Sequence, residues 1–418
     1  MTYVGCPRRR LDCEHIRHYL TLNGLEWTPT PRDADYLFLV TCGFYKLHED
    51  ASIGGILQLS RYRGELIVCG CLPATNMNRI RSVFGGKTFH TKEMEVLDEL
   101  FPHFPVKFKD VPDANRAFEE TERLEPMGFL YRAQRKLRNE KWLQPLLQIP
   151  EHVVAFDNTC FTLRIAEGCL GSCSYCVINK AIGRLKSKAI STIQDELRSG
   201  LKGPDYRVNL AASDTGAWGL DMGETFPHLL QVILDTDARI TIAYIEDIHP
   251  AWIIRYGDNL VTLAKTGRIN GLVSPFQSGS ERILSLMNRP SSLDTYREIM
   301  VRLKDAHPAM KTKTQVIVGF PTETEDDFAM TVHTIKACRF DEVDVFFYFE
   351  TADMDSAKIQ PKVPYNVVFN RLKRIVRLLP ENINMHCLTS NRLLSMILRN
   401  PLSPQIWALW GKLLYNRR

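Results

Sequence analysis

The sequence predicts an α/β protein with a small N-terminal domain and a larger domain built on a parallel sheet. Six apolar, strand-like runs alternate with five helical patterns between residues 161 and 349, and the same alternation recurs on a smaller scale in residues 1–105. The chain has 418 residues, of which 44% are hydrophobic and 24% charged. Such a chain is long enough for two or three domains with sizeable cores.

Regular alternation of strands and helices is typical of right-handed βαβ units, which build parallel sheets. Periodicity alone leaves open whether the large sheet is open or curls into a partial barrel. The expected strands cover residues 161–166, 208–212, 240–245, 271–276, 314–320 and 343–349, and the expected helices cover residues 192–202, 226–236, 251–267, 293–306 and 323–339.

The N-terminal part repeats this alternation with shorter elements. Residues 114–148 are charged and have little strand character, which predicts a helical or irregular linker. We expect helices at 12–23, 49–61 and 92–101 and strands at 36–40 and 65–70. The resulting organisation is an α/β domain over residues 1–110, a linker over 111–155, a larger domain over 156–360 and a basic helical tail over 361–418.

The tail carries the positive charge of the protein. From Pro364 to Arg418 there are nine Lys or Arg residues and one acid, a local charge of +8, whereas the whole chain has +5. Apolar residues at helical spacing predict helices separated by Pro401 and Pro404. Three roles remain open for the tail: a structural cap with solvated charges, a surface for an acidic partner or RNA, and a membrane-surface contact through Trp407 and Trp410.

Composition also predicts the compartment. No apolar run approaches the ~18 residues that span a bilayer, and the first residues lack the apolar core of a signal peptide. We therefore expect a cytoplasmic protein with no membrane span. Eleven cysteines, an odd number in a long chain, favour metal or redox chemistry over disulfides.

The most informative motif is Glu167-Gly-Cys-Leu-Gly-Ser-Cys-Ser-Tyr-Cys176, which follows the first strand of the larger domain. Loops at the carboxyl ends of parallel strands carry the sites of α/β enzymes. Cys169, Cys173 and Cys176 offer three thiolates for an iron–sulfur cube and leave one iron open for chemistry. The alternative is a zinc site, which usually has a fourth ligand and paired CxxC spacing.

This CxxxCxxC motif, with Tyr175 before its last cysteine, resembles the signature of radical S-adenosylmethionine (SAM) enzymes. Over most of the chain the sequence is similar to one branch of them, the methylthiotransferases, and it is closest to the subgroup that modifies an aspartate of a ribosomal protein. The segments that carry this resemblance lie at residues 5–14, 41–44 and 69–74 in the first domain and at 211–219, 276–282 and 317–324 in the second.

The resemblance implies a partial (β/α)6 barrel and two [4Fe-4S] clusters. The cluster on Cys169, Cys173 and Cys176 binds SAM and cleaves it to a 5′-deoxyadenosyl radical, with an external electron donor. Cys6, Cys42 and Cys71 hold a second cluster that delivers sulfur. From the residues alone, these three are more simply buried free cysteines, although each follows a strand-like run. We assign Cys13, Cys69, Cys160, Cys338 and Cys387 no ligand role.

Several other residues are candidates for cofactor contacts. Ser213 and Asp214 follow the second large-domain strand, where a helix cap or turn is an equal alternative. Gln277 follows a later strand, and Gly319-Phe320-Pro321 resembles a stretch that lines the adenosine pocket, with a plain turn as the alternative. We expect three further polar residues in a loop, Glu246, Asp247 and His249, to be solvated. With Tyr175, the cofactor set is Tyr175, Ser213, Asp214, Gln277, Gly319, Phe320 and Pro321.

The sequence departs from the family in two places. After residue 360 we find no alternating strands of the β-barrel module in which methylthiotransferases usually end, and Arg9 stands where the family usually has Asn. We therefore expect C–S bond formation on a peptide or a small molecule. The alternatives are methylthiolation of a ribosomal protein or transfer RNA, and a non-catalytic iron–sulfur redox sensor.

Overall fold

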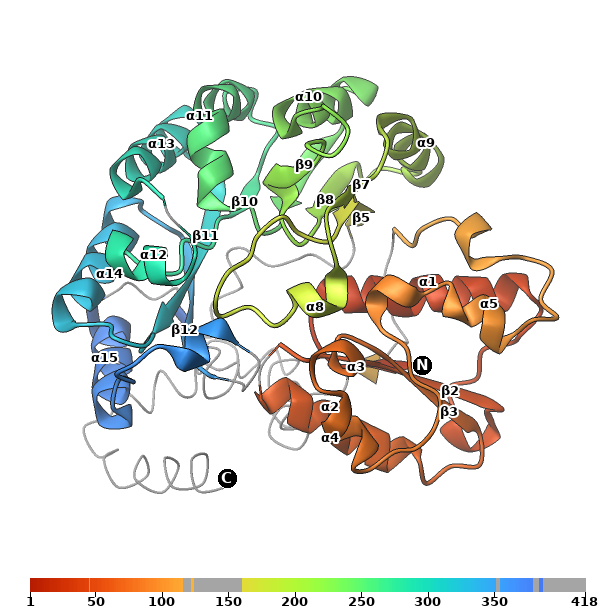
Figure 1. Ribbon diagram of the computed structural model, residues 1–418. Helices are drawn as coiled ribbons and strands as arrows, with labels where there is room; N and C mark the ends of the chain where they lie inside the picture. The colour runs from red at the N-terminus through yellow and green to blue at the C-terminus, as the bar shows by residue number, and fades with distance from the viewer. Residues whose placement is uncertain are drawn as a thin grey trace, which may run out of the picture.

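The computed structural model describes residues 1–44, 46–115, 122–123, 160–289, 291–350, 354–378 and 383–385. These residues form two α/β domains that meet along one interface (Figure 1). None of the helices in these ranges is long and apolar enough to cross a membrane.

The N-terminal domain is built on a four-stranded parallel sheet with the strand order β3-β2-β1-β4. The strands β2 and β3 lie where the apolar runs predict them. The prediction of little strand character after residue 114 is wrong at one point, because β4 pairs with β1. Two charged residues have no periodicity that would reveal a strand. The strands are β1 (Thr2–Tyr3), β2 (Tyr36–Thr41), β3 (Glu65–Gly70) and β4 (Glu122–Arg123).

Helices cover this sheet and begin close to its carboxyl edge. The first helix is longer than predicted, because it begins at Pro7, and proline at the first position of a helix has no amide whose bond would be lost. The helix predicted at 92–101 is instead a 3-10 turn, Thr91–Glu93, followed by a shorter helix. The α-helices are α1 (Pro7–Leu22), α2 (Lys46–Leu59), α3 (Leu72–Thr75), α4 (Met77–Arg81) and α5 (Val96–Leu100).

The larger domain has a parallel sheet of seven strands in the order β13-β12-β11-β10-β9-β8-β5. The described edges, β5 and β13, are not paired with each other, so the sheet is an open arc with its helices on the outside (Figure 1). The strands are β5 (Phe161–Arg164), β8 (Arg207–Ala211), β9 (Thr241–Ile245), β10 (Gly271–Val273), β11 (Lys311–Val318), β12 (Glu342–Phe347) and β13 (Ile383–Met385).

The outer helices follow from their apolar periodicity. In α10, Phe226, Leu229, Leu230, Ile233 and Leu234 share one face and are buried against the sheet. The structure confirms the predicted bounds of the helices at 226–236 and 293–306. The helices are α8 (Asn179–Ile182), α9 (Ile190–Gly200), α10 (Phe226–Thr236), α11 (Pro250–Ala264), α12 (Glu281–Leu286), α13 (Leu293–Ala306), α14 (Glu325–Ala337) and α15 (Tyr365–Leu378).

The predicted boundary at residue 360 does not separate a tail from the sheet. The helix expected after residue 363 is present as α15, but it packs against β11 and α14, and the chain then adds β13 beside β12. A purely helical tail is therefore wrong at residues 383–385. The patches and tryptophans predicted farther along the tail, and Cys387, lie outside the described residues.

Candidate functional site

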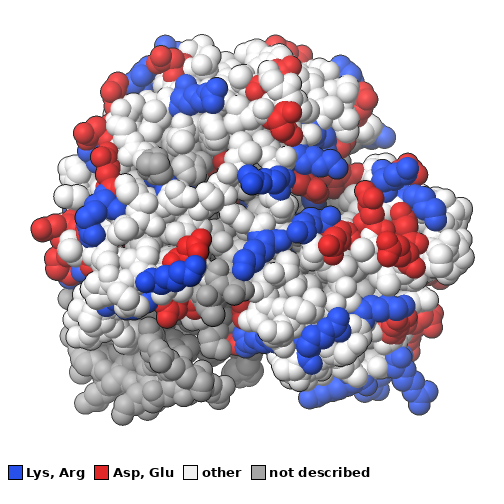
Figure 2. Space-filling model, viewed as in Figure 1, with Lys and Arg blue, Asp and Glu red and all other residues white. Residues whose placement is uncertain are grey.

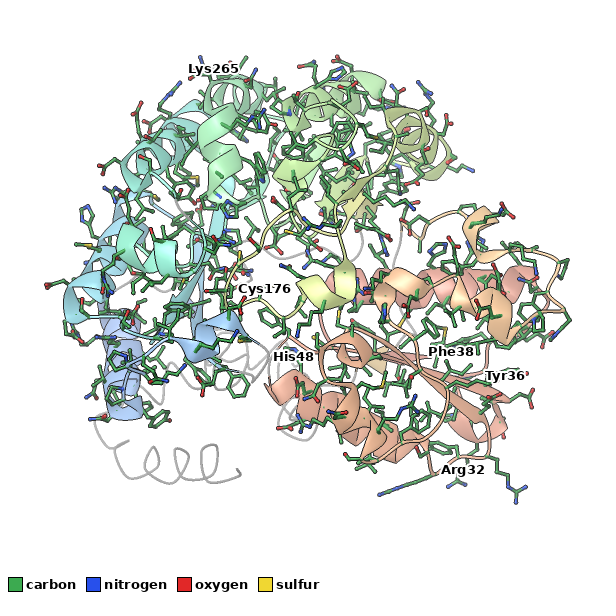
Figure 3. The ribbon with its side chains drawn as sticks, viewed as in Figure 1. Arg32, Tyr36, Phe38, His48, Cys176 and Lys265 are labelled. Atoms are coloured by element: carbon green, nitrogen blue, oxygen red, sulfur yellow. The ribbon has the colours of Figure 1, made fainter. Side chains whose placement is uncertain are left out.

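The loop with Cys169, Cys173 and Cys176 lies at the carboxyl end of β5. A short antiparallel ladder closes its base, between β6 (Ala166–Glu167) and β7 (Lys186–Ser187). The loop needs glycine at residue 168, which has a φ of +72° and whose added Cβ would lie 1.9 Å from the Arg184 carbonyl oxygen. All three cysteines are partly exposed. Figure 3 shows Cys176 on this loop, between the two domains.

Residues of and after α12 fix this loop in place. Ser174 donates from its backbone N–H to Met287 O at 3.0 Å and from its hydroxyl to Leu286 O at 2.8 Å. Asn288 donates to Ser172 O at 2.9 Å. The loop is thus attached to the opposite side of the arc, because α12 lies between β10 and β11 in the chain.

The three sulfur atoms have polar neighbours suited to a metal cluster. Gly171 donates its N–H to Cys169 Sγ at 3.2 Å, and Arg289 Nη1 lies 3.5 Å from Cys173 Sγ. An added Cβ at Gly171 would lie 3.3 Å from Cys169 Sγ and 3.7 Å from Cys173 Sγ, so both sulfurs face the same small residue. Burial raises the pKa of Cys169 to about 11, and a bound cation such as iron would favour its thiolate form.

No three His, Cys, Asp or Glu side chains within the described ranges are close enough together to hold a single metal ion. A four-iron cube attaches its thiolates at separate iron atoms, so its ligands need not converge on one point. The donor set, three thiolates with N–H donors and one guanidinium beside them, fits an iron–sulfur cube.

Cys6, Cys42 and Cys71 follow β1, β2 and β3, three neighbouring parallel strands whose carboxyl ends lie at one edge of the sheet. An added Cβ at Gly5 would lie 3.1 Å from Cys42 Sγ, which brings the first cysteine loop against the second. Cys71 N–H donates to Thr41 O at 2.9 Å, which attaches the third loop. The structure therefore places these three cysteines together, and burial raises the pKa of Cys71 to about 11.

The other cysteines that the structure describes lie in cores. Cys69 is fully buried within β3, and Cys13 packs on the same side of the sheet within α1. Cys160 and Cys338 are also buried. Core packing is the role that the sequence predicts for Cys69, Cys160 and Cys338.

The Cys169–Cys176 loop of the larger domain and the cysteine loops of the N-terminal domain lie at the interface between the domains. Arg8, two residues after Cys6, donates to the Ala212 carbonyl oxygen and to Asp247 Oδ2 at 3.3 Å, and its Nη1 lies 3.4 Å from Glu246 Oε2. Arg164 in β5 pairs with Asp12 of α1 at 2.9 Å. The ring of Phe44, beyond Cys42, lies 5.8 Å from that of Phe346 at the end of β12.

The prediction that Glu246, Asp247 and His249 are solvated is wrong for Glu246, whereas Asp247 and His249 are half-buried. Glu246 is only 6% exposed, and its pKa is raised to about 7 because burial outweighs the effect of Arg8. His249 caps α11, where its Nδ1 accepts from Ala251 N–H at 3.0 Å. Sequence reasoning missed these roles because the partner of Glu246 and Asp247 belongs to the other domain.

Of three predicted cofactor residues, Tyr175 is part of the cluster loop, Asp214 is buried after β8, and Ser213 lies at the domain interface. Asp214 is buried and accepts from Trp252 Nε1 at 2.7 Å, and burial raises its pKa to about 6. The Tyr175 ring packs in an apolar group with Ile283 and Phe320. Ser213 lies instead at the domain interface, beside Arg8.

The remaining predicted residues lie beside β11, in the case of Gln277, or directly after it. Gln277 has a φ of +68° and a buried Oε1 that accepts no hydrogen bond within the described structure. Phe320 is fully buried, so its side chain contributes to the core and only its backbone can face a ligand. Gly319 and Pro321 form the turn after β11, where Gly319 N–H donates to Glu323 Oε2 at 2.7 Å.

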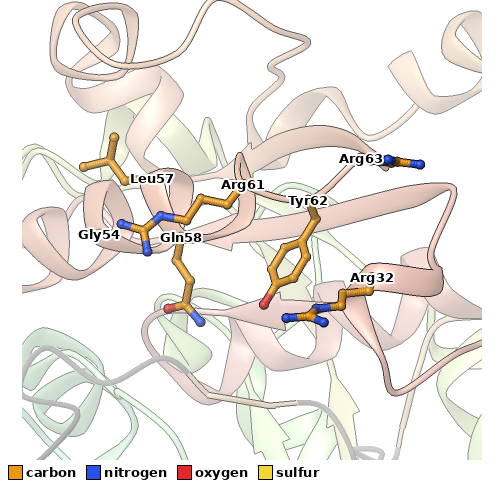
Figure 4. A pocket seen from close by; sticks show the side chains of 7 residues that line it. All are labelled: Arg32, Gly54, Leu57, Gln58, Arg61, Tyr62 and Arg63. Atoms are coloured by element: carbon orange, nitrogen blue, oxygen red, sulfur yellow. The ribbon is translucent and has the colours of Figure 1, made fainter.

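An open cavity of about 1010 Å³ lies away from the cysteine sites, between η1 (Pro31–Asp33) and the end of α2 (Figure 4). Its described lining includes Arg32, Arg61, Tyr62 and Arg63 and no cysteine. These residues precede β2 and β3, whereas the cysteines follow those strands. The cavity is therefore at the opposite edge of the sheet from the cysteine loops.

A parallel arc of strands with a three-cysteine loop after its first strand defines a radical SAM enzyme. Residues 163–335 match the Radical SAM superfamily, and residues 1–89 match a family described as Uncharacterized protein family UPF0004. In fold, the chain is similar to a solved radical SAM methyltransferase, TsrM from Kitasatospora setae, with a TM-score of 0.50 and 12% identity, over 81% of this chain and 67% of that one.

Two relatives extend the similarity over both domains. The ribosomal protein uS12 methylthiotransferase RimO from Geobacter sulfurreducens is 28% identical over 390 residues, and RimO from Escherichia coli is 26% identical over 392. Each match covers 90% of this chain and 80% of the relative. Residues 163–335 thus match a radical SAM domain, and over both domains the chain is similar to methylthiotransferases, which indicates an enzyme that uses SAM and a [4Fe-4S] cluster.

Proposed function

We propose that this enzyme inserts sulfur into a C–H bond of a ribosomal protein, with a cluster at each of the two cysteine sets. The observation that carries the proposal is that Cys6, Cys42 and Cys71 gather at the carboxyl edge of one sheet and face the loop of the other three cysteines across the domain interface. When bound, the first cluster and SAM supply a radical that abstracts hydrogen, and a second cluster supplies sulfur.

Arginine side chains lie beside both cysteine sites and connect them across the domain interface. Arg8 extends from the helix that follows Cys6 and binds the carboxyl ends of β8 and β9 through Ala212 and Asp247. Arg289 places its guanidinium Nη1 3.5 Å from Cys173 Sγ, beside the position of the first cluster.

The ribosomal-protein substrate is favoured by the relatives, because both are named for uS12 and match both domains. A peptide or small-molecule substrate is the second candidate, and it is supported by the lack, in the sequence after residue 385, of the alternating strand pattern of the β-barrel module. Thiolate-held clusters require a reducing compartment such as the cytoplasm and an external electron donor.

The test is product analysis with anaerobically reconstituted enzyme, SAM, sulfide and a chemical reductant. We expect 5′-deoxyadenosine and a methylthio group on an aspartate of the purified uS12 of the source organism. 5′-Deoxyadenosine without modified uS12 would favour the second candidate. Absence of 5′-deoxyadenosine from a fully loaded protein would favour the redox-sensor alternative and contradict the proposal.

A further inference from the structure

The open cavity at the far edge of the N-terminal sheet has a basic lining, which we call the basic groove. Arg32 of η1 and Arg61 and Arg63 after α2 contribute to it, together with Gln58 and Tyr62. Its described lining contains no acidic side chain. In Figure 4 the side chains of Arg32, Gln58 and Tyr62 point toward one another. Figure 2 shows Lys and Arg side chains along the margin of the domain where Figure 3 labels Arg32.

The three arginines of the groove are available to a ligand. Arg32, Arg61 and Arg63 are all exposed. In the part of the chain that the structure describes, none of the three side chains forms an ion pair or a hydrogen bond. Asp33, the neighbour of Arg32 in the chain, does not line the groove. Three positive charges that no acid offsets repel one another, so a bound anion would stabilise this part of the domain.

The size and chemistry of the groove indicate the class of anion. Its volume of about 1010 Å³ is at the upper limit of small-molecule pockets, and it is open, which suits a chain that runs along it rather than an enclosed ligand. A guanidinium binds phosphate through two parallel hydrogen bonds. The half-buried ring of Tyr62, between Arg61 and Arg63 in the chain, adds a flat face on which a base can stack. An acidic peptide would use the arginines but has no base for the ring.

The position of the groove separates it from the reacting groups. Arg32 precedes β2, whereas Cys42 follows that strand. The strand has six residues, and a rise of about 3.3 Å per residue places its two ends about 20 Å apart. A chain held in the groove is therefore anchored to the enzyme away from the clusters and is not the group that reacts.

We propose that the basic groove binds single-stranded RNA through its phosphates and so anchors the enzyme beside its substrate. The choice of RNA over an acidic protein segment rests on the proposed function, because a ribosomal protein in its assembled particle is surrounded by RNA. Binding of RNA to the groove is measurable without that reaction.

The test is fluorescence anisotropy of a short labelled oligouridylate with the full-length, cluster-reconstituted protein over a range of salt concentrations. The variant is Arg32→Gln/Arg61→Gln/Arg63→Gln. Each phosphate contact to a single strand contributes about 0.7 to the slope of log affinity against log salt, so we expect this slope to fall by about 2. Binding at about 0.1 M salt should weaken by at least about tenfold.

The matched control is Arg198→Gln/Arg239→Gln/Arg302→Gln. It removes the same charge from exposed positions of the larger domain, where each arginine pairs with an aspartate, and it should bind like the wild type. Equal losses in the two triple variants, or no binding by the wild type, would overturn the proposal. Displacement of the RNA by polyglutamate as readily as by unlabelled oligouridylate would also overturn it, in favour of an acidic protein partner.

Crosslinking of the wild-type protein locates the RNA even if the triple variant does not fold. With 4-thiouridine in the oligonucleotide, we expect a photo-crosslinked peptide that contains Tyr62. Crosslinks confined to residues after 385 would place the RNA on the basic tail and contradict the proposal. None of these measurements uses SAM, a reductant or uS12, so their outcome is independent of whether sulfur insertion occurs.

Discussion

The turn after β11 is held by a buried ion pair whose removal should be costly. Arg371 of α15 donates from Nη1 to Glu323 Oε2 at 2.8 Å and from Nη2 to Glu323 O, and the two side chains are 3% and 0% exposed. Glu323 also accepts from Gly319 N–H, and an added Cβ at Gly319 would lie 2.5 Å from Val368 of the same helix. The helix α15 thus supports the Gly319-Phe320-Pro321 turn.

Replacing Arg371 with Met leaves the Glu323 carboxylate buried without its cation, which costs about 3–5 kcal/mol of unfolding free energy. Burial already raises the pKa of Glu323 to about 7, so the folded state favours its protonated form. Stability from this group is therefore full at low pH and falls as pH rises from about 4.5 towards 7. The loss in Arg371→Met should be larger at about pH 8 than at about pH 6, because more of Glu323 is then ionised.

Urea unfolding of the metal-free protein, followed by circular dichroism, measures this loss. The control is Arg374→Met, whose pair with Glu325 is about half exposed and should contribute less than about 1 kcal/mol. The double variant Arg371→Met/Glu323→Gln should recover part of the stability, since no buried charge remains. A loss of unfolding free energy below about 1 kcal/mol for Arg371→Met, or equal losses for both arginines, would contradict a stabilising role of the buried Arg371–Glu323 pair.

Three further predictions concern the cluster loop and the interface. Gly168→Ala should reduce the iron bound after reconstitution by about four per chain, because its Cβ would clash with Arg184 O; Gly54→Ala, with no atom within 4 Å, should not. Arg289→Gln should lower the midpoint potential of the SAM cluster by roughly tens of millivolts in a redox titration followed by electron paramagnetic resonance, since a positive charge beside Cys173 is lost; an unchanged potential would contradict this. Burial alone would raise the pKa of Asp113, but Arg164 and Lys188 lower this pKa to about 2. The ionised Asp113 should therefore stabilise the fold by about 2 kcal/mol above about pH 4. This stabilisation is lost as the pH falls towards 2. Asp113→Asn should flatten the acid limb of the unfolding curve, and an unaltered limb would contradict that assignment.

The sequence predicts those helices and strands whose conformation follows from their own residues. The helix α10 has an apolar face at helical spacing, and α14 begins with a capping box in which Thr324 and Asp327 bond each other's backbone. Strands β4 and β13 could not be predicted, because two or three residues carry no periodicity and owe their conformation to the neighbouring strand.

The sequence likewise reveals some residues of the candidate site and not others. The three cysteines of the first loop are recognisable because they are close in sequence, whereas Cys6, Cys42 and Cys71 are brought together only by the strand order of the sheet. The pairing of Arg8 with Asp247 joins residues 239 positions apart, and no local pattern reports it. Arg371 belongs to the tail, for which a structural cap with solvated charges is one of the predicted roles, but the structure places it in a buried pair.

We propose that two sets of three cysteines each hold a four-iron cluster. The most direct test is the iron and acid-labile sulfide content of the anaerobically reconstituted protein, beside a variant with Cys169, Cys173 and Cys176 all changed to Ala. Two clusters predict about eight iron atoms per wild-type chain and about four in the variant. About four in the wild type and none in the variant would contradict the second cluster, and with it sulfur delivery from Cys6, Cys42 and Cys71.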